Sequence, residues 1–182
     1  MSDSFLGIPG YRPADLRGVG DLVAAHGARL SALVGRPLTR GWLLWDLHED
    51  TWFADAPVLL ELDGVQLEIQ HSKFDDLSLT WSTVDPRAAV AFPDMGPDVE
   101  FDLVWRDDAV KDLSRLHGQH VLAVDLVEWR GADMANGMVA VSLTFEDGRL
   151  TVENALDENG LHFGALPPEY RVLSRRASGD PA

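Results

Sequence analysis

One short polar stretch holds the residue types most able to carry out acid–base or metal chemistry. His71 is followed by Lys73, and Asp75 and Asp76 stand side by side just after it. In a cleft, two adjacent carboxylates can bind a divalent cation or divide into a general acid and a general base. The alternative is a turn, because Asp side chains hydrogen-bond to nearby backbone N–H groups in turns.

The remaining motifs give little support for catalysis. His117 and His120 flank Gly118, and an HxxH pair with no third ligand nearby is a weak zinc signal. The chain has no cysteine, which excludes disulfides, thiolate catalysis and cysteine-based zinc sites. It also lacks a glycine-rich phosphate loop and a GxSxG serine motif. The sequence therefore predicts no catalytic residue, no cofactor and no metal ion.

Aromatic residues suggest a different kind of site. The chain has six tryptophans, and Trp42, Trp45 and Trp52 lie close to acids such as Asp55. These side chains could fill the core. They could also form an acidic and aromatic recognition surface, because interface hot spots favour Trp and acids attract a basic partner.

The net charge narrows the range of partners. It is −15, with an isoelectric point near 4.5, so DNA, RNA and anionic membranes are repelled. Acidity could equally serve solubility alone. The first residues lack the pattern of a signal peptide, and the apolar runs are too short to span a bilayer. We expect a cytoplasmic protein, monomeric or homodimeric, that binds neither nucleic acid nor membranes.

The chain repeats its own pattern. Residues 33–38 resemble residues 116–121, 83 positions later, and the alternating apolar residues that follow keep this offset until one residue is lost. Acids recur at the corresponding places, 75–76 and 157–158, which favours the turn interpretation for them. An internal duplication of this kind predicts two halves with the same fold.

Periodicity and turn signals predict the elements of each copy. A helical turn over 13–16 precedes the first copy. The first copy is expected to have a helix capped by Asp21 and strands over 38–47, 58–62, 65–69 and 77–81. The second is expected to have a short helix capped by Asp107 or Asp108 and strands over 120–130, 137–145, 149–153 and 160–164.

These elements predict an α+β fold in which each copy has a helix followed by about four mainly antiparallel strands. The copies cover approximately 21–84 and 107–164, and pairing them in a pseudo-two-fold arrangement would cover their open edges. We expect one compact domain over 1–173, with a linker at 85–98, an extra strand at 99–105 and a flexible tail at 174–182.

Three strings, at 52–58, 73–81 and 156–161, resemble a group of uncharacterised hypothetical proteins from GC-rich, actinobacteria-like genomes. The resemblance covers much of 33–163. It implies an internally duplicated α+β domain and no particular activity.

The leading hypothesis is a non-enzymatic binding protein of the toxin-immunity type, which binds a basic protein partner. The alternative is a small-ligand-binding protein or enzyme with a polar cleft between the two copies, formed by His71, Lys73, Asp75 and Asp76. A third possibility is a structural or regulatory module that dimerises through an open sheet edge.

Overall fold

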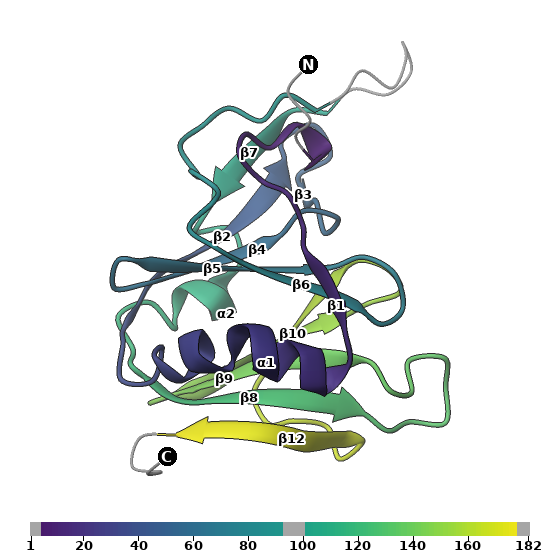
Figure 1. Cartoon of the computed structure of the whole chain (residues 1–182). Coiled ribbons are helices and arrows are strands. Elements are labelled where there is room, and N and C mark those ends of the chain that lie inside the picture. The colour runs from purple at the N-terminus through teal and green to yellow at the C-terminus, as the bar shows by residue number, and fades with distance from the viewer. Residues whose placement is uncertain (1–4, 93–100, 178–182) are drawn as a thin grey trace.

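The structure is a computed structural model that describes residues 5–92 and 101–177. It is mainly β-sheet with few helices, which agrees with the predicted α+β class. Two antiparallel sheets lie one above the other (Figure 1), and α1 (Gly18–Ser31) packs against an edge strand of each sheet. Neither helix in the described ranges has the length and apolar composition that a membrane-spanning helix requires.

Seven strands of the described residues form the first sheet, in the order β1-β6-β5-β4-β2-β3, with β7 paired to the free side of β2. Its strands are β1 (Asp15–Arg17), β2 (Leu38–Asp46), β3 (Thr51–Trp52), β4 (Val58–Leu62), β5 (Val65–His71), β6 (Asp76–Trp81) and β7 (Leu103–Arg106).

The second sheet has the order β11-β10-β9-β8-β12. Its strands are β8 (Val121–Trp129), β9 (Val139–Phe145), β10 (Gly148–Asn154), β11 (Asn159–Phe163) and β12 (Tyr170–Ala177). A one-turn helix, α2 (Lys111–Ser114), precedes β8, and a 3₁₀ turn, η1 (Phe5–Gly7), opens the described chain.

The two sheets share strand registers at corresponding positions. Leu60 is opposite Leu67 in the first sheet, and Leu143 is opposite Leu150 in the second, 83 positions later. The first long strand has a β-bulge after Leu38, and the second has one at the corresponding place. Each sheet therefore contains a four-stranded meander of the same design.

Four backbone hydrogen bonds join the segment before β2 to the segment before β8. The N–H of Gly35 donates to the carbonyl of Val121 at 2.8 Å, and the N–H of Gly118 donates to the carbonyl of Leu38 at 2.7 Å. Leu38 and Val121 in turn donate to residues 119 and 36, each at 2.9 Å. Every bond thus has a counterpart 83 positions away, with the roles of the two halves exchanged. We call these bonds the seam.

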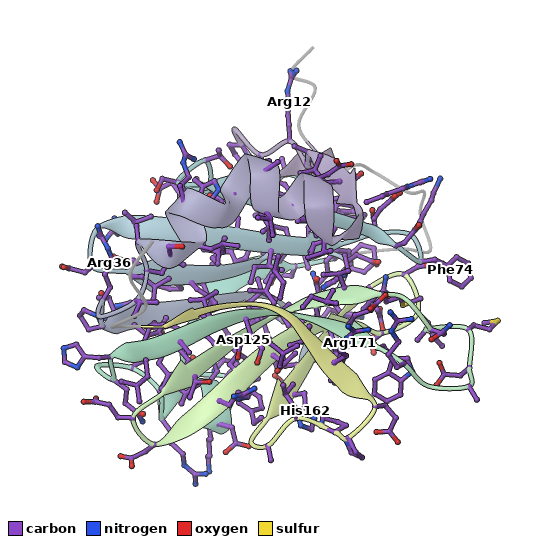
Figure 2. The ribbon with its side chains drawn as sticks, turned by 60° about the horizontal axis from the view of Figure 1, so that its bottom comes forward. Arg12, Arg36, Phe74, Asp125, His162 and Arg171 are labelled. Atoms are coloured by element: carbon purple, nitrogen blue, oxygen red, sulfur yellow. The ribbon has the colours of Figure 1, made fainter. Side chains whose placement is uncertain are left out.

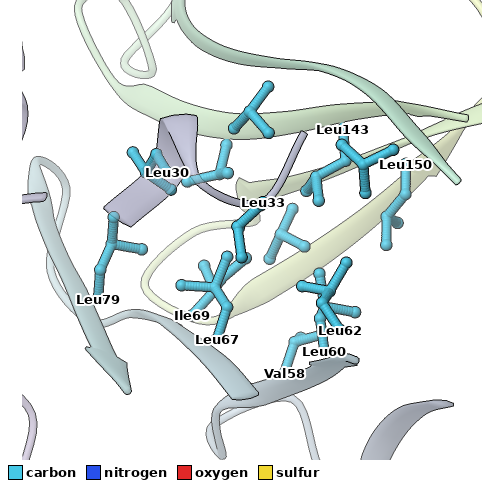
Figure 3. Close-up of a cluster of buried hydrophobic side chains, with 14 of the residues drawn as sticks. Leu30, Leu33, Val58, Leu60, Leu62, Leu67, Ile69, Leu79, Leu143 and Leu150 are labelled. Atoms are coloured by element: carbon cyan, nitrogen blue, oxygen red, sulfur yellow. The ribbon is translucent and has the colours of Figure 1, made fainter. Parts of the chain in front are cut away.

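The main core lies between the sheets and draws on both halves of the chain. Leu30 and Leu33 from the first helical segment meet Val58 and Leu60 of the first sheet and Leu143 of the second (Figure 3). These side chains alternate with outward-facing ones along each strand, which gives every strand a face for the shared interior. Burying both inner faces together makes the described parts of the two halves one packing unit.

A second apolar cluster covers the outer face of the first sheet. Ile8 and Tyr11 from the N-terminal segment pack with Leu44, Leu59 and Val84. Beneath them the Glu68 carboxylate is fully buried and accepts hydrogen bonds from five donors: the side chains of Gln66, Thr80 and Thr83, and the backbone N–H groups of Thr83 and Val84. These bonds compensate the loss of water around a buried carboxylate and anchor the chain as it leaves β6.

Several expected boundaries were wrong. Asp21 does not cap α1, since the helix begins at Gly18 after Arg17 and has no side-chain cap. Neither Asp107 nor Asp108 caps α2, which follows Val110. Those two aspartates instead pair with the arginines at 40 and 106.

Other differences concern the edges of the sheets. Residues 15–17 form an edge strand against β6, where a helical turn was expected. β12 pairs with β8 and extends to Ala177, so part of the expected tail is a strand. The extra strand is β7, at 103–106, while the expected positions 99–100 and the 93–98 part of the linker lie outside the described residues.

Candidate functional site

His71, the first residue of the predicted polar cleft, lies in the interior. Its side chain is part of the layer between the halves and is 1% exposed. Nε2 lies 3.2 Å from the carbonyl of Val152, and the backbone N–H donates to Oδ1 of Asn159 at 2.8 Å. Burial lowers the pKa of His71 to about 4, so the ring is neutral near pH 7 and Nε2–H is the donor to Val152.

The turn between β5 and β6 contains Lys73 and Asp75 and ends at Asp76, the first residue of β6. The N–H of Asp76 donates to the carbonyl of Lys73 at 2.7 Å, which closes the turn. Asp76 accepts a hydrogen bond from the side chain of Arg17, and this bond lowers the pKa of the Asp76 carboxyl. Lys73 and Asp75 are exposed, with Asp75 3.8 Å from Arg17. The turn therefore holds three of the four residues together, while His71 faces the interior.

The predicted aromatic surface is divided between two faces of β2. Trp42 packs into the outer cluster, and the guanidinium of Arg40 lies over its ring. Trp45 lies three positions after Trp42 on β2, so it points to the other side of the sheet because side chains alternate between faces. There it is opposite Trp52 on β3. Asp55 is exposed in the loop that follows β3. Trp45 and Trp52 remain together as a pair, and Trp42 is separate from them.

The two histidines beside Gly118 also have separate partners. Nε2 of His117 accepts a hydrogen bond from the N–H of Gly41 at 3.0 Å, while His120 lies beside Glu146. Over the described part of the chain, no group of three or more His, Cys, Asp or Glu side chains is placed to hold a metal ion.

Three exposed apolar side chains, none of which the sequence analysis singled out, gather at one edge of the molecule. Met134 is 70% exposed, Leu156 is 71% exposed and Phe74 is 49% exposed. Phe74 projects outward from the β5–β6 turn (Figure 2). Large apolar side chains that gather on a surface indicate an interaction site more strongly than scattered ones. We call these three residues and the carboxylates around them the loop surface.

Hydrogen bonds hold two of the three loops against each other. The N–H of Phe74 donates to Oδ1 of Asp157 at 3.0 Å, and Nδ2 of Asn154 donates to the carbonyl of Phe74 at 3.1 Å. Asn154 also accepts a hydrogen bond from the N–H of Asp157 at 2.8 Å. The β5–β6 and β10–β11 turns are thereby joined, with Phe74 and Leu156 at their tips.

The third loop, which connects β8 to β9 and carries Met134, completes a cavity of about 310 Å³ beside Leu156. Its apolar lining consists of Met134, Ala135, Met138, Ala155 and Leu156. Methionine side chains are unbranched and polarizable, so they adapt to differently shaped apolar partners. The cavity is large enough to receive one apolar side chain from another molecule.

The backbone at the tip of this surface is strained. Leu156 has φ +61° and Asp157 has φ +72°. Asp adopts this left-handed region more readily than most residues, but a bulky residue such as Leu rarely does. Strain of this kind costs on the order of 1–3 kcal/mol per residue and concentrates at functional sites. The strained conformation holds a large apolar side chain in solvent.

Carboxylates surround the apolar side chains. Asp75, Asp133 and Glu158 are exposed on the three loops that form the surface. Asp133 also accepts hydrogen bonds from Nε1 of Trp129 at 2.8 Å and from the N–H of Ala135 at 3.0 Å, which fixes the loop that carries Met134. The surface thus combines an apolar centre with an acidic rim.

A sequence signal for this surface exists, although it is not periodic. Phe74, Met134 and Leu156 are each large apolar residues next to an aspartate in a polar loop between two strands. Alternation assigns apolar residues to strands and helices, and so it passes over an apolar residue in a turn.

Comparisons of the chain with models of protein families, with curated proteins and with solved structures found no match.

Proposed function

We propose that this chain is a non-enzymatic protein-binding module of the toxin-immunity type, which blocks a basic partner protein by binding it at the loop surface. The observation that carries the proposal is the exposed apolar centre of Phe74, Met134 and Leu156 beside an adaptable cavity. Burying these three side chains against a partner would supply the apolar anchor that protein interfaces require.

Charge supports a basic partner. The chain has 30 acidic and 15 basic side chains, and the loop surface has exposed carboxylates on all three of its loops. A potential of this sign accelerates encounters with a positively charged protein and repels acidic ones. The partner would present an apolar side chain flanked by lysine or arginine.

The proposal includes a duplicated architecture and a cytoplasmic location. The matching registers, the corresponding bulges and the seam support the view that the two halves are copies of one unit. Phe74 and Leu156 hold corresponding positions in those copies, on the turns between the last two strands of each meander. The binding surface would then lie where equivalent turns of the two copies meet.

The test is capture of a partner, followed by affinity measurement with matched variants. The chain is immobilised and exposed to extracts of its source organism, and a captured basic protein is purified for calorimetry. Leu156→Asn removes the apolar side chain, and Asn tolerates φ near +60°, so this variant should fold at least as stably as the wild type. Leu122→Asn on β8 is the control, because Leu122 is exposed elsewhere.

The expected result is a complex whose dissociation constant rises with salt concentration. Leu156→Asn should weaken it by about tenfold or more, as expected for an interface hot spot, whereas Leu122→Asn should not. Capture of an acidic protein, or equal affinity of the wild type and Leu156→Asn, would overturn the proposal.

A further inference from the structure

A second cavity, of about 380 Å³, lies away from the loop surface. It is formed by the C-terminal end of α1, the start of β5 and the end of β6. It is lined by Arg29, Ala32, Leu33, Arg36, Val65, Trp81 and Ser82. None of these residues belongs to the loop surface. The lining contains two cations and no carboxylate, in a chain with twice as many acids as bases.

Arg36 is held in place by the backbone. Its Nε donates to the carbonyl of Ala32 at 3.0 Å, and Nη1 donates to the carbonyl of Asp63 at 3.0 Å. Both acceptors are neutral, so the positive charge of the guanidinium is not compensated by them. A side chain fixed in this way loses little rotamer entropy when it binds an anion.

Arg29 supplies the second charge. Its guanidinium carbon lies 5.5 Å from the centre of the Trp81 ring, a cation–π distance. Within the described residues neither Arg29 nor Arg36 forms an ion pair, although six other arginines do. Two unpaired guanidiniums on one cavity attract an anion.

The floor of the cavity is apolar and fixed. Leu33 is buried, and Val65 and Trp81 are half-buried. Nε1 of Trp81 donates to Nδ1 of His26 at 3.2 Å. Burial and the nearby Arg29 charge lower the pKa of His26, which keeps the ring neutral and able to accept this bond. The indole is therefore held in one orientation as a flat apolar surface.

The corresponding positions of the second half lack these features. Asp112 stands where Arg29 would be and forms an ion pair with Arg115 at 2.8 Å. Gln119 stands where Arg36 would be; it donates to the carbonyl of Arg115 at 2.9 Å and accepts from the N–H of Asp147 at 2.8 Å. The scaffold bond made by position 36 is thus preserved at position 119 without the charge. A purely structural role would not require arginine at position 36.

We propose that this cavity binds a small aromatic carboxylate, with its carboxylate on Arg36 and Arg29 and its ring against Leu33, Val65 and Trp81. A guanidinium matches the planar geometry of a carboxylate. A flat aromatic system of one or two fused rings fits a cavity of this size and gains from burial on the apolar floor. The strongly negative charge of the whole chain disfavours polyanions such as nucleoside triphosphates. The class of ligand that fits is therefore a monoanion.

The test uses 2-naphthoate as the probe and follows the Trp81 indole N–H signal in ¹H–¹⁵N spectra of the whole 182-residue chain. Trp81→Phe identifies the signal. 2-Naphthamide keeps the ring but has no charge, so it measures the contribution of the carboxylate. Acetate keeps the carboxylate but has no ring, so it measures the contribution of the ring. Arg36→Gln introduces the side chain found at position 119 and should preserve the fold. Arg12→Gln makes the same charge change at an exposed arginine outside the cavity (Figure 2).

The expected result is a saturable shift of the Trp81 signal by 2-naphthoate. Arg36→Gln should weaken binding by about tenfold, the effect of losing one charge-assisted hydrogen bond, and Arg12→Gln should leave it unchanged. Acetate and 2-naphthamide should each bind more weakly than 2-naphthoate by a similar factor. Equal binding of 2-naphthoate to the wild type and Arg36→Gln, equal binding of 2-naphthamide, or no saturable shift at millimolar probe would overturn the proposal.

Discussion

A single buried imidazole links the two halves at the scale of the residue. His71 belongs to β5, yet its ring donates to Val152 on β10 and its backbone donates to the side chain of Asn159 on β11. Asn159 continues the link, since its amide donates to the carbonyls of Ala54 and Ala56 at 3.2 and 2.8 Å. Each of these buried polar groups therefore depends on a partner in the other half.

The neutral state of His71 makes the free energy of unfolding depend on pH. The pKa is lowered from 6.5 to about 4 in the folded protein, so the unfolded chain binds more protons between those values. Stability from this group is complete above about pH 6.5 and is lost as the pH falls toward 4. For His71→Gln, which cannot titrate, we expect the loss between about pH 7.5 and 4.5 to be smaller than for the wild type by roughly 2–3 kcal/mol.

Urea denaturation at several pH values measures this difference directly. The other histidines and the carboxylates titrate in both proteins, so their contributions cancel in the comparison. Parallel stability curves for wild type and variant over this range would show that His71 does not titrate with a lowered pKa.

At the scale of the element, alternation and turn chemistry predicted most of the strands. The two Asp-Gly turns, at 63–64 and 147–148, placed the hairpins β4–β5 and β9–β10 within a few residues. The predicted helix caps were wrong because the aspartates lie near the helix starts but not at the cap positions, where Arg17 and Val110 stand without side-chain caps. Packing of Leu22, Leu30 and Leu113 into the core stabilises these two helices in place of capping bonds.

Elements without a pattern of their own could not be predicted. β1 has three residues and forms through its pairing with β6, and β12, which lacks strict apolar and polar alternation, is paired with β8. Both depend on a partner strand that is distant in sequence, and the local strand propensity of a segment does not indicate that partner. The same holds for the loop surface, because Phe74, Met134 and Leu156 meet only after the three loops are placed by their sheets.

The N-terminal segment offers a test of how an element is held on the outer face. Gly7 has φ +71°, and a Cβ atom there would lie 1.8 Å from the carbonyl oxygen of Ala91. Gly7→Ala should therefore cost about 3 kcal/mol or more, from the clash and the left-handed backbone together. The expected consequence is release of the segment around η1 from the outer cluster, seen as faster proteolysis there.

Gly18→Ala is the matched control for this substitution. Gly18 has φ +76°, nearly the same backbone conformation, but a Cβ atom there would meet nothing within 4 Å. This variant should cost only about 1–2 kcal/mol. Equal destabilisation by the two variants would mean that contact between Gly7 and Ala91 does not hold the segment in place.

At the scale of the whole molecule, the seam and the shared core make the halves interdependent. The four seam bonds lie at the entry to β2 and β8, directly beside Leu33 and Leu116, which enter the same core. The inner faces of both meanders are buried in this one core. We therefore expect that the two halves recognised from the sequence repeat do not fold as independent domains.

This interdependence predicts one unfolding transition that substitutions in either half shift equally. Leu33→Ala and Leu116→Ala remove corresponding buried side chains, and each should cost about 2–5 kcal/mol. Both should lower the midpoint of urea unfolding, with far-UV circular dichroism and tryptophan fluorescence moving together. If the halves folded independently, each variant would shift a separate transition and leave the other at its wild-type midpoint. Two such transitions in either variant would contradict a single cooperative core.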